Sequence, residues 1–409
     1  MESFFKVKTP KEVLGIMDGF GPLGEEEISL GDSLGRILSK DVLSPEDLPG
    51  FARSSMDGYA VKAEDTFGAT ESLPALLAVS GEVLMGERPR INVGQGQAVR
   101  ISTGGMLPKG ADGVVMVEYC HLIDEDTLEV NRAISPLENV IQPGDDVQKG
   151  DRVLKQGHQM RPQDVGVMAG LGKTKAFFYR KPRVAIISTG DEIVGVDKQP
   201  LPGQVRDMNR YTLSSFCLQE GAEPIYVGLC PDDFEPMKAM VERALEKADS
   251  VWISGGSSVG TRDLTLQVLE TLPQFELLVH GISISPGKPT IIGQSGLRSV
   301  IGLPGHVGSA LVVAKVFLSR LIHRLSGCSE VSERFPDPEA RLSRNVESAS
   351  GREDYVRVRV VEDRGRLVAE PIFGKSGLIS TLVEADAFIR IDRNAEGLYQ
   401  GETVKLIFF

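Results

Sequence analysis

Several short polar, glycine-containing segments of this chain carry residue types that can hold an anion or a cation. The clearest is segment 254–263, SGGSSVGTRD, which follows an apolar run. Glycine lets backbone N–H groups turn toward an anion, and serine hydroxyls add donors. The segment predicts an oxyanion-binding loop, although paired glycines also make ordinary tight turns. The candidate residues are Gly255, Gly256, Ser257, Ser258, Gly260 and Asp263.

A pair of acids follows another apolar run, 183–188. Asp191 and Glu192 lie in the sequence STGDE. Adjacent carboxylates at the end of a buried strand are unfavourable unless they are solvated, paired or bound to a cation. A Mg²⁺ ion that bridges a carboxylate and a phosphate would suit them. An ordinary strand-to-loop turn with solvated acids would also produce this sequence.

Two further segments add donors. Lys288 lies in PGKP, where the prolines restrict its reach and its ammonium can hold an oxyanion as a point charge. Segment 302–309, GLPGHVGS, opens an apolar helical run, so its N–H groups are expected to face the same edge of the sheet. For His306 alone, a hydrogen-bonded structural role is the better interpretation. The candidates in this segment are Pro304, Gly305, His306 and Ser309.

Four more polar residues have a less specific pattern. Asp207 and Asn209 either contact a ribose or a base, or cap the helix that follows them. Asp57 in SSMDGYA is either a ligand acid or a turn residue. Thr103 lies in ISTGG, which has the same polar, glycine-rich character. No single segment decides the function, but their joint occurrence does.

The elements that must position these residues alternate between strand and helix from residue 182 to about 327. Strands are expected at 183–188, 224–229, 250–254, 288–293 and 299–303. Helices are expected at 211–220, up to 247, from Asp263 onward, and up to 325. This alternation predicts a parallel sheet with right-handed crossovers, and ligands bind at the carboxyl ends of such strands. Those ends carry STGDE, SGGSSVG and GLPG.

The two ends of the chain have different patterns. Short alternating strands at 341–346, 355–361, 367–372, 387–391 and 404–408 predict a small all-β domain. Before residue 180, helices are expected at 11–21, 30–38 and 162–170, with glycine-rich strands from about 59 to 130.

Length and composition limit the function classes. With 409 residues, roughly two to four domains are expected. The net charge of −12 argues against nucleic acid as the main partner, but not against a small anionic ligand. No apolar run approaches the ~20 residues that span a bilayer, and the N-terminus lacks the pattern of a signal peptide, so a cytoplasmic protein without membrane association is expected. The four cysteines show no Cys-x-x-Cys spacing, which argues against a zinc site or a disulfide framework.

Seven segments together resemble one family. In chain order they are FARSSMDGYAV, ISTGGMLPKGADGVVMVE, GDDV, VAIISTGDEI, SGGSSVGTRD, SPGKP and GLPG. They are similar to the molybdopterin molybdenumtransferases, the MoeA proteins and the gephyrin E domain. The similarity covers essentially the whole chain, including the tail with its GKSG at 374–377.

The resemblance implies a multidomain α/β plus β architecture. It comprises a central doubly wound α/β (molybdopterin-binding, MogA-like) domain, a glycine-rich mixed β domain, a discontinuous linker domain and a C-terminal small β-barrel-like domain. The expected boundaries are 1–47 with 140–180 for the discontinuous N-terminal domain, 48–139 for the glycine-rich domain, 181–328 for the α/β domain and 329–409 for the C-terminal domain.

The resemblance also implies an activity and its site. Molybdate would enter adenylylated molybdopterin with Mg²⁺ as cofactor and release of AMP, in a homodimer whose active site lies between subunits. Molybdopterin adenylyltransferase and molybdoenzyme maturation factors are the expected partners. Asp191 and Glu192 match the acids near Mg²⁺ and phosphate. The remaining matches are Ser258, Asp263, Lys288, Ser309 and Asp232 in the α/β domain, and Asp57, Thr103 and Asp146 from the partner subunit.

The chain departs from the family pattern near the expected oxyanion pocket. The family usually has GLPGNPVSA, whereas this chain has GLPGHVGSA. Ser285 replaces a common lysine, and Ser257 replaces valine. These changes make tungstate an alternative to molybdate. Three competing functions remain at this point: a fold-retaining carrier or scaffold without turnover, a molybdopterin adenylyltransferase, and a pyrophosphatase that acts on another nucleotide.

Overall fold

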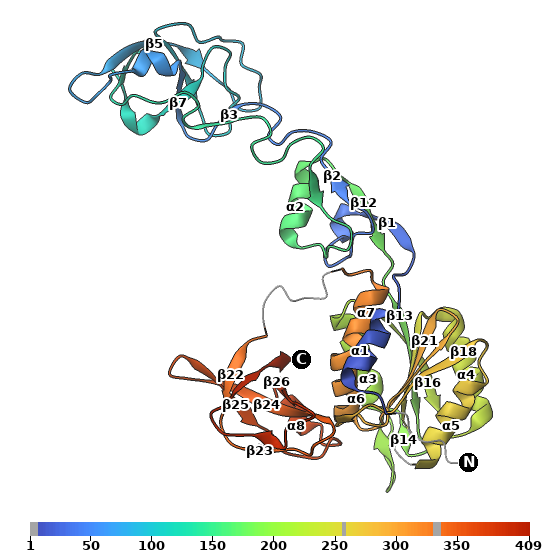
Figure 1. Cartoon of the computed structure of the whole chain (residues 1–409). Helices are drawn as coiled ribbons and strands as arrows, with labels where there is room; N and C mark the ends of the chain where they lie inside the picture. The colour runs from blue at the N-terminus through green and yellow to red at the C-terminus, as the bar shows by residue number, and fades with distance from the viewer. Residues whose placement is uncertain (1–6, 256–258, 330–336) are drawn as a thin grey trace. The chain divides into compact units, whose positions relative to one another are not determined.

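The computed structural model describes residues 7–255, 259–329 and 337–409 and divides into two compact units (Figure 1). One unit comprises Met1–Lys40, Gln156–Arg161 and Lys175–Phe409, and the other comprises Asp41–Lys155 and Pro162–Thr174. This division is coarser than the four predicted domains, whose boundaries stay predictions. Within the described ranges, no helix combines the length and the apolar character that crossing a membrane requires.

A six-stranded sheet forms the centre of the larger unit. Its order is β16 (Glu223–Cys230), β13 (Arg183–Thr189), β17 (Ser250–Gly255), β21 (Arg298–Leu303), β20 (Ile291–Ser295) and β18 (Phe275–His280). The first four strands are parallel, as predicted. The prediction of a wholly parallel sheet is wrong at the other edge, where β20 runs antiparallel to both neighbours. Only residues 296 and 297 join β20 to β21, and a turn this short can join only antiparallel strands.

Helices cover both faces of this sheet (Figure 1). One face carries α1 (Pro10–Asp18), α3 (Asn209–Gln219) and a continuous helix made of α6 (Val307–Val313), a π-helical turn (Ala314–Leu318) and α7 (Ser319–Leu325). The other face carries α4 (Phe234–Lys247) and α5 (Val259–Glu270). The doubly wound α/β prediction is therefore confirmed.

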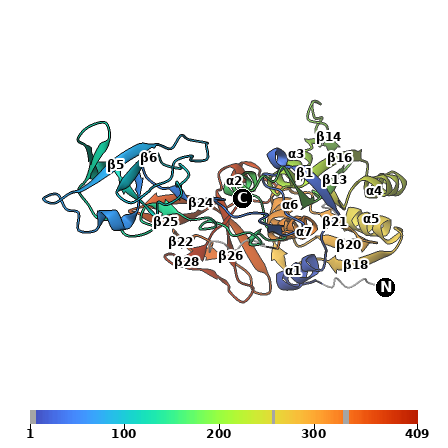
Figure 2. The ribbon, with the colours of Figure 1, turned by 90° about the horizontal axis from the view of Figure 1, so that it is seen from above.

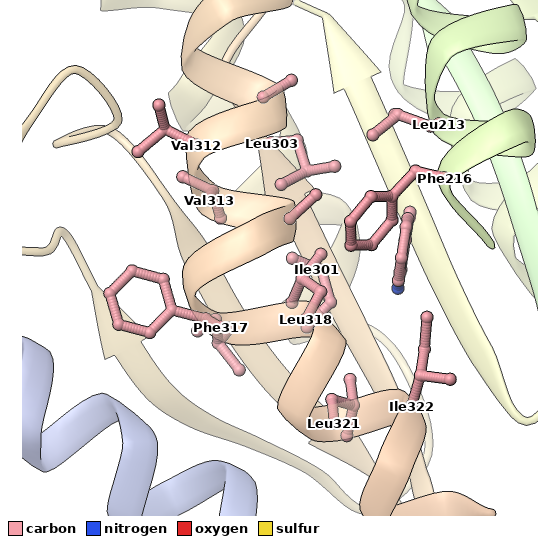
Figure 3. Packing of buried hydrophobic residues seen from close by; sticks show 14 of the residues in the cluster. Leu213, Phe216, Ile301, Leu303, Val312, Val313, Phe317, Leu318, Leu321 and Ile322 are labelled. Atoms are coloured by element: carbon pink, nitrogen blue, oxygen red, sulfur yellow. The ribbon is translucent and has the colours of Figure 1, made fainter. Parts of the chain in front are cut away.

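The alternation of side chains along β17 explains this two-sided packing. Trp252 packs in the cluster beneath α3, α6 and α7, whereas its neighbours Val251 and Ile253 pack in the cluster beneath α4 and α5. Figure 3 shows Phe216 of α3 and Leu318 of the π-helical turn in the first cluster. Because side chains of this size each stabilise the fold by about 1.5–3 kcal/mol when buried, the two clusters hold the strand ends rigidly.

One predicted helix does not form. Segment 30–38 contains only a 3-10 turn, Leu30–Asp32, and Ile37 and Leu38 then form isolated β-bridges with Gln159 and Phe178. Gly35 adopts a φ of 74°, which ends helical geometry. Of the apolar residues that suggested a helix, Ile37 and Leu38 are buried, whereas Leu34 is exposed. Leu38 lies opposite Phe178 of β12 (Lys175–Tyr179), which pairs with β1 (Glu25–Ser29).

The C-terminal strands form a nearly closed sheet, which confirms the all-β prediction (Figure 2). Its order is β28 (Thr403–Lys405), β22 (Glu339–Leu342), β25 (Arg366–Pro371), β24 (Glu353–Asp363), β26 (Ala387–Ile391) and β29 (Ile407–Phe408). The two edge strands, β28 and β29, are separated by Leu406 alone, so one short segment closes the barrel-like sheet. β19 (Ile284–Ser285), from the α/β part of the chain, pairs with β24.

The smaller unit contains a mixed six-stranded sheet. Its order is β7 (Gly113–Met116), β4 (Gly58–Val61), β6 (Gln97–Ile101), β5 (Ala75–Glu82), β9 (Thr127–Val130) and β8 (Cys120–Leu122). The predicted short helix is present as α2 (Pro162–Gly170). A Cβ on Gly58 would lie 1.9 Å from the carbonyl oxygen of Val115, so the pairing of β4 with β7 requires glycine there.

Candidate active site

A cavity of about 340 Å³ borders the carboxyl ends of β13, β17 and β21. Its wall includes residues that follow these strands, residues that precede α3, and Gly377 from the C-terminal part of the chain. The cavity lies where ligands bind in sheets of this type, as predicted. The predicted site residues on its wall are Glu192, Asp207, Asn209, Gly255, Gly305 and His306.

Gly255 brings the loops after β13 and β17 together. Its φ is 159°, and a Cβ would lie 2.1 Å from the carbonyl oxygen of Thr189, so no other residue fits. The predicted loop residues Gly256, Ser257 and Ser258 lie outside the described residues. Gly260 and Asp263 belong to α5, which begins at Val259, four residues before the predicted start. Asp263 therefore lies inside the helix rather than at its first position.

Three acids lie near one another beside this cavity, and of these Glu192 lines it. The backbone N–H of Asp232 donates to Oδ1 of Asp191 over 3.2 Å. Burial raises the pKa of Asp232, and the charges of Asp191 and Glu192 raise it further, whereas a hydrogen bond with Thr189 opposes the shift. Asp232 Oδ1 is buried and has no hydrogen-bond partner among the described residues. The predicted acid pair is thus part of a group of three, which the fold assembles from the ends of β13 and β16.

These acids suit a cation that is also coordinated by water and by the substrate. Within the described ranges, no three His, Cys, Asp or Glu side chains are arranged to hold a metal ion by themselves. Mg²⁺ is usually held by one or two carboxylates together with substrate phosphates and water, so a complete protein cage is not required. The unpartnered Asp232 Oδ1 and the exposed Asp191 and Glu192 carboxylates provide oxygen donors of the type that Mg²⁺ prefers.

Asn209 joins two of the strand ends across the cavity floor. Its Nδ2 donates to Ser254 Oγ at 2.6 Å and to the Gly305 carbonyl oxygen at 2.8 Å. Its Oδ1 is buried, and no described residue is its partner, so this acceptor is free for a ligand. The sequence suggested Asn209 but did not suggest Ser254 as its anchor, because the two residues are 45 positions apart.

Asp207 caps α3, which is one of its two predicted roles. Its Oδ1 accepts a hydrogen bond from the backbone N–H of Arg210 at 3.0 Å, and its side chain is almost fully buried. The hydroxyl of Tyr226 lies 3.5 Å from Oδ2. Because both carboxylate oxygens have protein neighbours, Asp207 is primarily a structural part of the cavity wall.

Of the predicted residues near the end of β21, some line the cavity and others do not. His306 lies on the cavity wall, and its Nδ1 lies 2.9 Å from Ser376 Oγ, which confirms the hydrogen-bonded interpretation. Pro304 and Ser309 are buried, and the backbone N–H of Ser309 donates to the His306 carbonyl oxygen at 3.0 Å. Lys288 is exposed in the turn before β20 and does not line this cavity.

The remaining predicted residues belong to the smaller unit. Asp57 Oδ1 accepts hydrogen bonds from both the backbone N–H of Thr103, at 2.7 Å, and its hydroxyl, at 3.1 Å. The structure thus brings together two residues that the sequence suggested separately. Asp146 is exposed, and its backbone N–H donates to the Leu48 carbonyl oxygen at 3.1 Å.

Family models match all three parts of the chain. The "MoeA N-terminal region (domain I and II)" model matches residues 8–172, the "Probable molybdopterin binding domain" model matches residues 185–324, and the "MoeA C-terminal region (domain IV)" model matches residues 339–409. Fold and site together define a multidomain protein of molybdenum-cofactor biosynthesis, built around a molybdopterin-binding α/β domain. The chain belongs to the MoeA family, the molybdopterin molybdenumtransferases.

Individual relatives agree with this assignment over nearly the full length. The molybdopterin molybdenumtransferase of Haemophilus influenzae is 35% identical over 94% of this chain and 94% of its own. The enzyme of the same name from Bacillus subtilis is 30% identical over 95% of this chain and 91% of its own. The crystal structure of the molybdopterin biosynthesis MoeA protein from Pyrococcus horikoshii OT3 is similar at a TM-score of 0.86 and 30% identity, covering 99% of this chain and all of that one.

Proposed function

We propose that this molybdenumtransferase inserts molybdate into adenylylated molybdopterin and releases AMP. The observation that carries the proposal is the cavity at the carboxyl ends of β13, β17 and β21, which Glu192 lines and beside which Asp191 and Asp232 lie. A phosphate-containing substrate needs a cavity with polar groups on its wall, and the divalent cation that accompanies it needs carboxylates nearby.

The cavity wall suits the nucleotide end of the substrate. The free Asn209 Oδ1 can accept a hydrogen bond from a ribose hydroxyl or a base amino group. The glycine and serine residues that follow β17 in the sequence would supply N–H and hydroxyl donors to a phosphate. We assign Gly256, Ser257, Ser258, Gly260 and Asp263 to this phosphate contact, as the family pattern implies.

Mg²⁺ would be held by Asp191 and Glu192, with Asp232 beside them. When bound, it would polarise the phosphoanhydride and make AMP a better leaving group. The chain's own residues orient the acids, because Asp191 is hydrogen-bonded to the backbone of Asp232. We propose that Lys288 and Ser309 bind the oxyanion, either molybdate or tungstate. The Lys288 ammonium and the Ser309 hydroxyl would each donate a hydrogen bond to it.

A homodimer completes the proposed site. Asp57, Thr103 and Asp146 would then serve the α/β domain of a second copy, which is testable by complementation between subunits. A chain with Asp57→Ala and a chain with Asp191→Asn should each be inactive alone. When the two chains are co-expressed, up to about a quarter of wild-type activity should return. Half of the dimers in a random mixture contain one chain of each kind, and one of the two sites in each such dimer carries neither change. Failure to recover any activity would contradict a shared site.

The proposed setting is the cytoplasm, with an adenylyltransferase supplying the substrate and molybdoenzyme maturation factors receiving the product. Cys120, Cys217 and Cys230 form no disulfide with a described residue, which agrees with a reducing compartment.

AMP release from adenylylated molybdopterin tests the proposal directly. Molybdate and tungstate should be supplied separately, with and without Mg²⁺. Release that depends on both oxyanion and Mg²⁺ is expected, and Asp191→Asn should lower it by at least about tenfold. Asp197→Asn is a matched control, because Asp197 is exposed on the same chain segment and does not line the cavity. Tight pterin binding without release would instead favour a carrier or scaffold.

A further inference from the structure

The C-terminal part of the chain reaches the cavity through one short segment. Residues 374–377, GKSG, contact the beginning of α6 at two points. His306 Nδ1 lies 2.9 Å from Ser376 Oγ, and the backbone N–H of Gly308 donates to the Ser376 carbonyl oxygen at 3.1 Å. Gly377, the next residue, lies with His306 on the cavity wall.

The other end of this segment is anchored from β24. Arg357 Nη2 donates to the Gly374 carbonyl oxygen at 2.6 Å, and Nη1 of the same guanidinium donates to Thr381 Oγ1. Burial lowers the pKa of Arg357 from its ordinary value. The segment is therefore held between β24 on one side and the start of α6 on the other.

Gly308 leaves room for this contact. A Cβ on Gly308 would lie 2.7 Å from the carbonyl oxygen of Ser376, closer than real Cβ atoms approach a backbone oxygen. The glycine at this position therefore permits an approach that any β-carbon would block. A Cβ on Gly377 would lie 3.7 Å from Cδ2 of the His306 imidazole, in ordinary contact. A longer side chain there would compete with the ring for space.

We propose that His306 is a positioning residue that holds Ser376, and through it the adjacent Gly377, which lines the substrate cavity. Gly308 is its necessary companion. His306 and Gly308 then act on the same residue, one through its side chain and the other through the space that it leaves. This inference rests on the proposed function, because it assigns the wall to the site for adenylylated molybdopterin.

The imidazole has a specific consequence for Ser376. A hydroxyl that donates to an unprotonated Nδ1 offers only its lone pairs to other groups. A hydroxyl that accepts from a protonated Nδ1 keeps its own hydrogen for an anionic ligand. His306 therefore sets both the place of Ser376 and the polarity of the hydrogen bond that Ser376 can make.

Steady-state AMP release by the full-length protein tests the proposal. His306→Ala is expected to raise KM for adenylylated molybdopterin by about tenfold while kcat stays within about twofold of wild type, since uniform substrate binding is lost. Gly308→Val should give the same change with His306 intact, because the valine displaces Ser376. His306→Gln should restore KM to within about threefold, since its amide reaches the hydroxyl with either a donor or an acceptor.

A double variant tests whether His306 and Ser376 act through their mutual contact or independently of each other. His306→Ala combined with Ser376→Ala should be no worse than either single change, because both remove the same contact. Ser380→Ala, on the neighbouring helix α8 (Ser380–Val383), is a matched control that should behave as wild type. An unchanged KM in both His306→Ala and Gly308→Val would overturn the proposal, as would a loss of kcat and melting temperature without a change in KM.

Amide hydrogen exchange tests the contact between α6 and segment 374–377 without an activity measurement. In the wild type, the N–H of Gly308 should be protected, and both His306→Ala and Gly308→Val should expose segment 374–377 to faster exchange. If the wild type released no AMP and bound no adenylylated molybdopterin, the proposed function would fail. Unaltered exchange in the two variants would refute the link itself.

Discussion

The Oδ1 atom of Asp191 accepts a hydrogen bond from the backbone N–H of Asp232, so two carboxylates from adjacent strand ends are held side by side. Burial and the neighbouring charges raise the pKa of Asp232 above its ordinary value of 3.8. Because the folded pKa lies above the unfolded one, ionisation of Asp232 destabilises the fold at neutral pH.

Asp232→Asn should therefore stabilise the protein and impair catalysis. Without Mg²⁺ at pH 7, the melting temperature is expected to rise by about 1–3 °C, because an unfavourable charge is removed. The gain should disappear as the pH falls below the pKa of the folded state, where Asp232 is already neutral. Mg²⁺-dependent AMP release should fall by about 10- to 100-fold. A lower melting temperature at pH 7 would show that the carboxylate stabilises the fold.

A buried carboxylate at the end of α3 should make stability depend on acid pH. Glu220 receives hydrogen bonds from Ser319 Oγ at 3.0 Å and from His323 Nε2 at 3.1 Å, and Lys315 Nζ lies 3.6 Å away. Burial alone would raise the pKa of Glu220, but the His323 hydrogen bond and the Lys315 charge outweigh it and leave the pKa below 4.5. The stabilisation is complete above pH 4.5 and is lost as the pH falls through the folded pKa.

Glu220→Ala should lower the free energy of unfolding by about 3 kcal/mol at pH 7, since it removes the acceptor of the partly buried Lys315, His323 and Ser319 donors. Glu223→Ala is the matched control. Its exposed carboxylate lies 3.8 Å from Arg183, and such pairs contribute at most about 1 kcal/mol. Denaturant unfolding of the protein at pH 7 and pH 4 measures both. Equal losses in the two variants would contradict a special role for the buried pair.

Replacing Asp207 should separate its cap role from a ligand role. Asp207→Ala is expected to cost about 0.5–2 kcal/mol of stability, because the N–H of Arg210 loses its acceptor. Asp207→Ser should recover most of this loss, since a serine hydroxyl accepts the same bond. If AMP release recovers together with stability, Asp207 acts through the helix. A stable but inactive serine variant would instead indicate contact with the nucleotide.

The cysteines should be unreactive. Burial raises the pKa of Cys230 to about 11 and that of Cys120 to about 12, and it raises the pKa of Cys217 as well. Since the thiolate is the reactive form, little alkylation by iodoacetamide is expected within minutes at pH 8 in the native protein. Mass spectrometry of the native and the urea-unfolded protein provides the comparison. Rapid labelling of Cys217 in the native state would mean that the core around α3 opens readily.

Local sequence patterns were sufficient to predict the family and the α/β core, and they led us to expect ligand binding at the carboxyl ends of its strands. Apolar runs such as 183–188 and 250–254 predict strands because a buried parallel strand must be apolar on both faces. Polar and glycine residues such as Asp191 and Gly255 then follow these runs directly. Short-range patterns of this kind contain enough information to place them at one edge of the sheet.

The contacts among these residues emerged only from the three-dimensional packing. It joined Asp232 to Asp191, Asn209 to Ser254, and His306 to Ser376, which is 70 positions away. The structure also differs from the prediction in two places: β20 is antiparallel to its neighbours, and segment 30–38 contains β-bridges where a helix was predicted. Local propensity is weak where the partner of a segment is distant in the chain, because hydrogen bonds and burial with that partner then outweigh it.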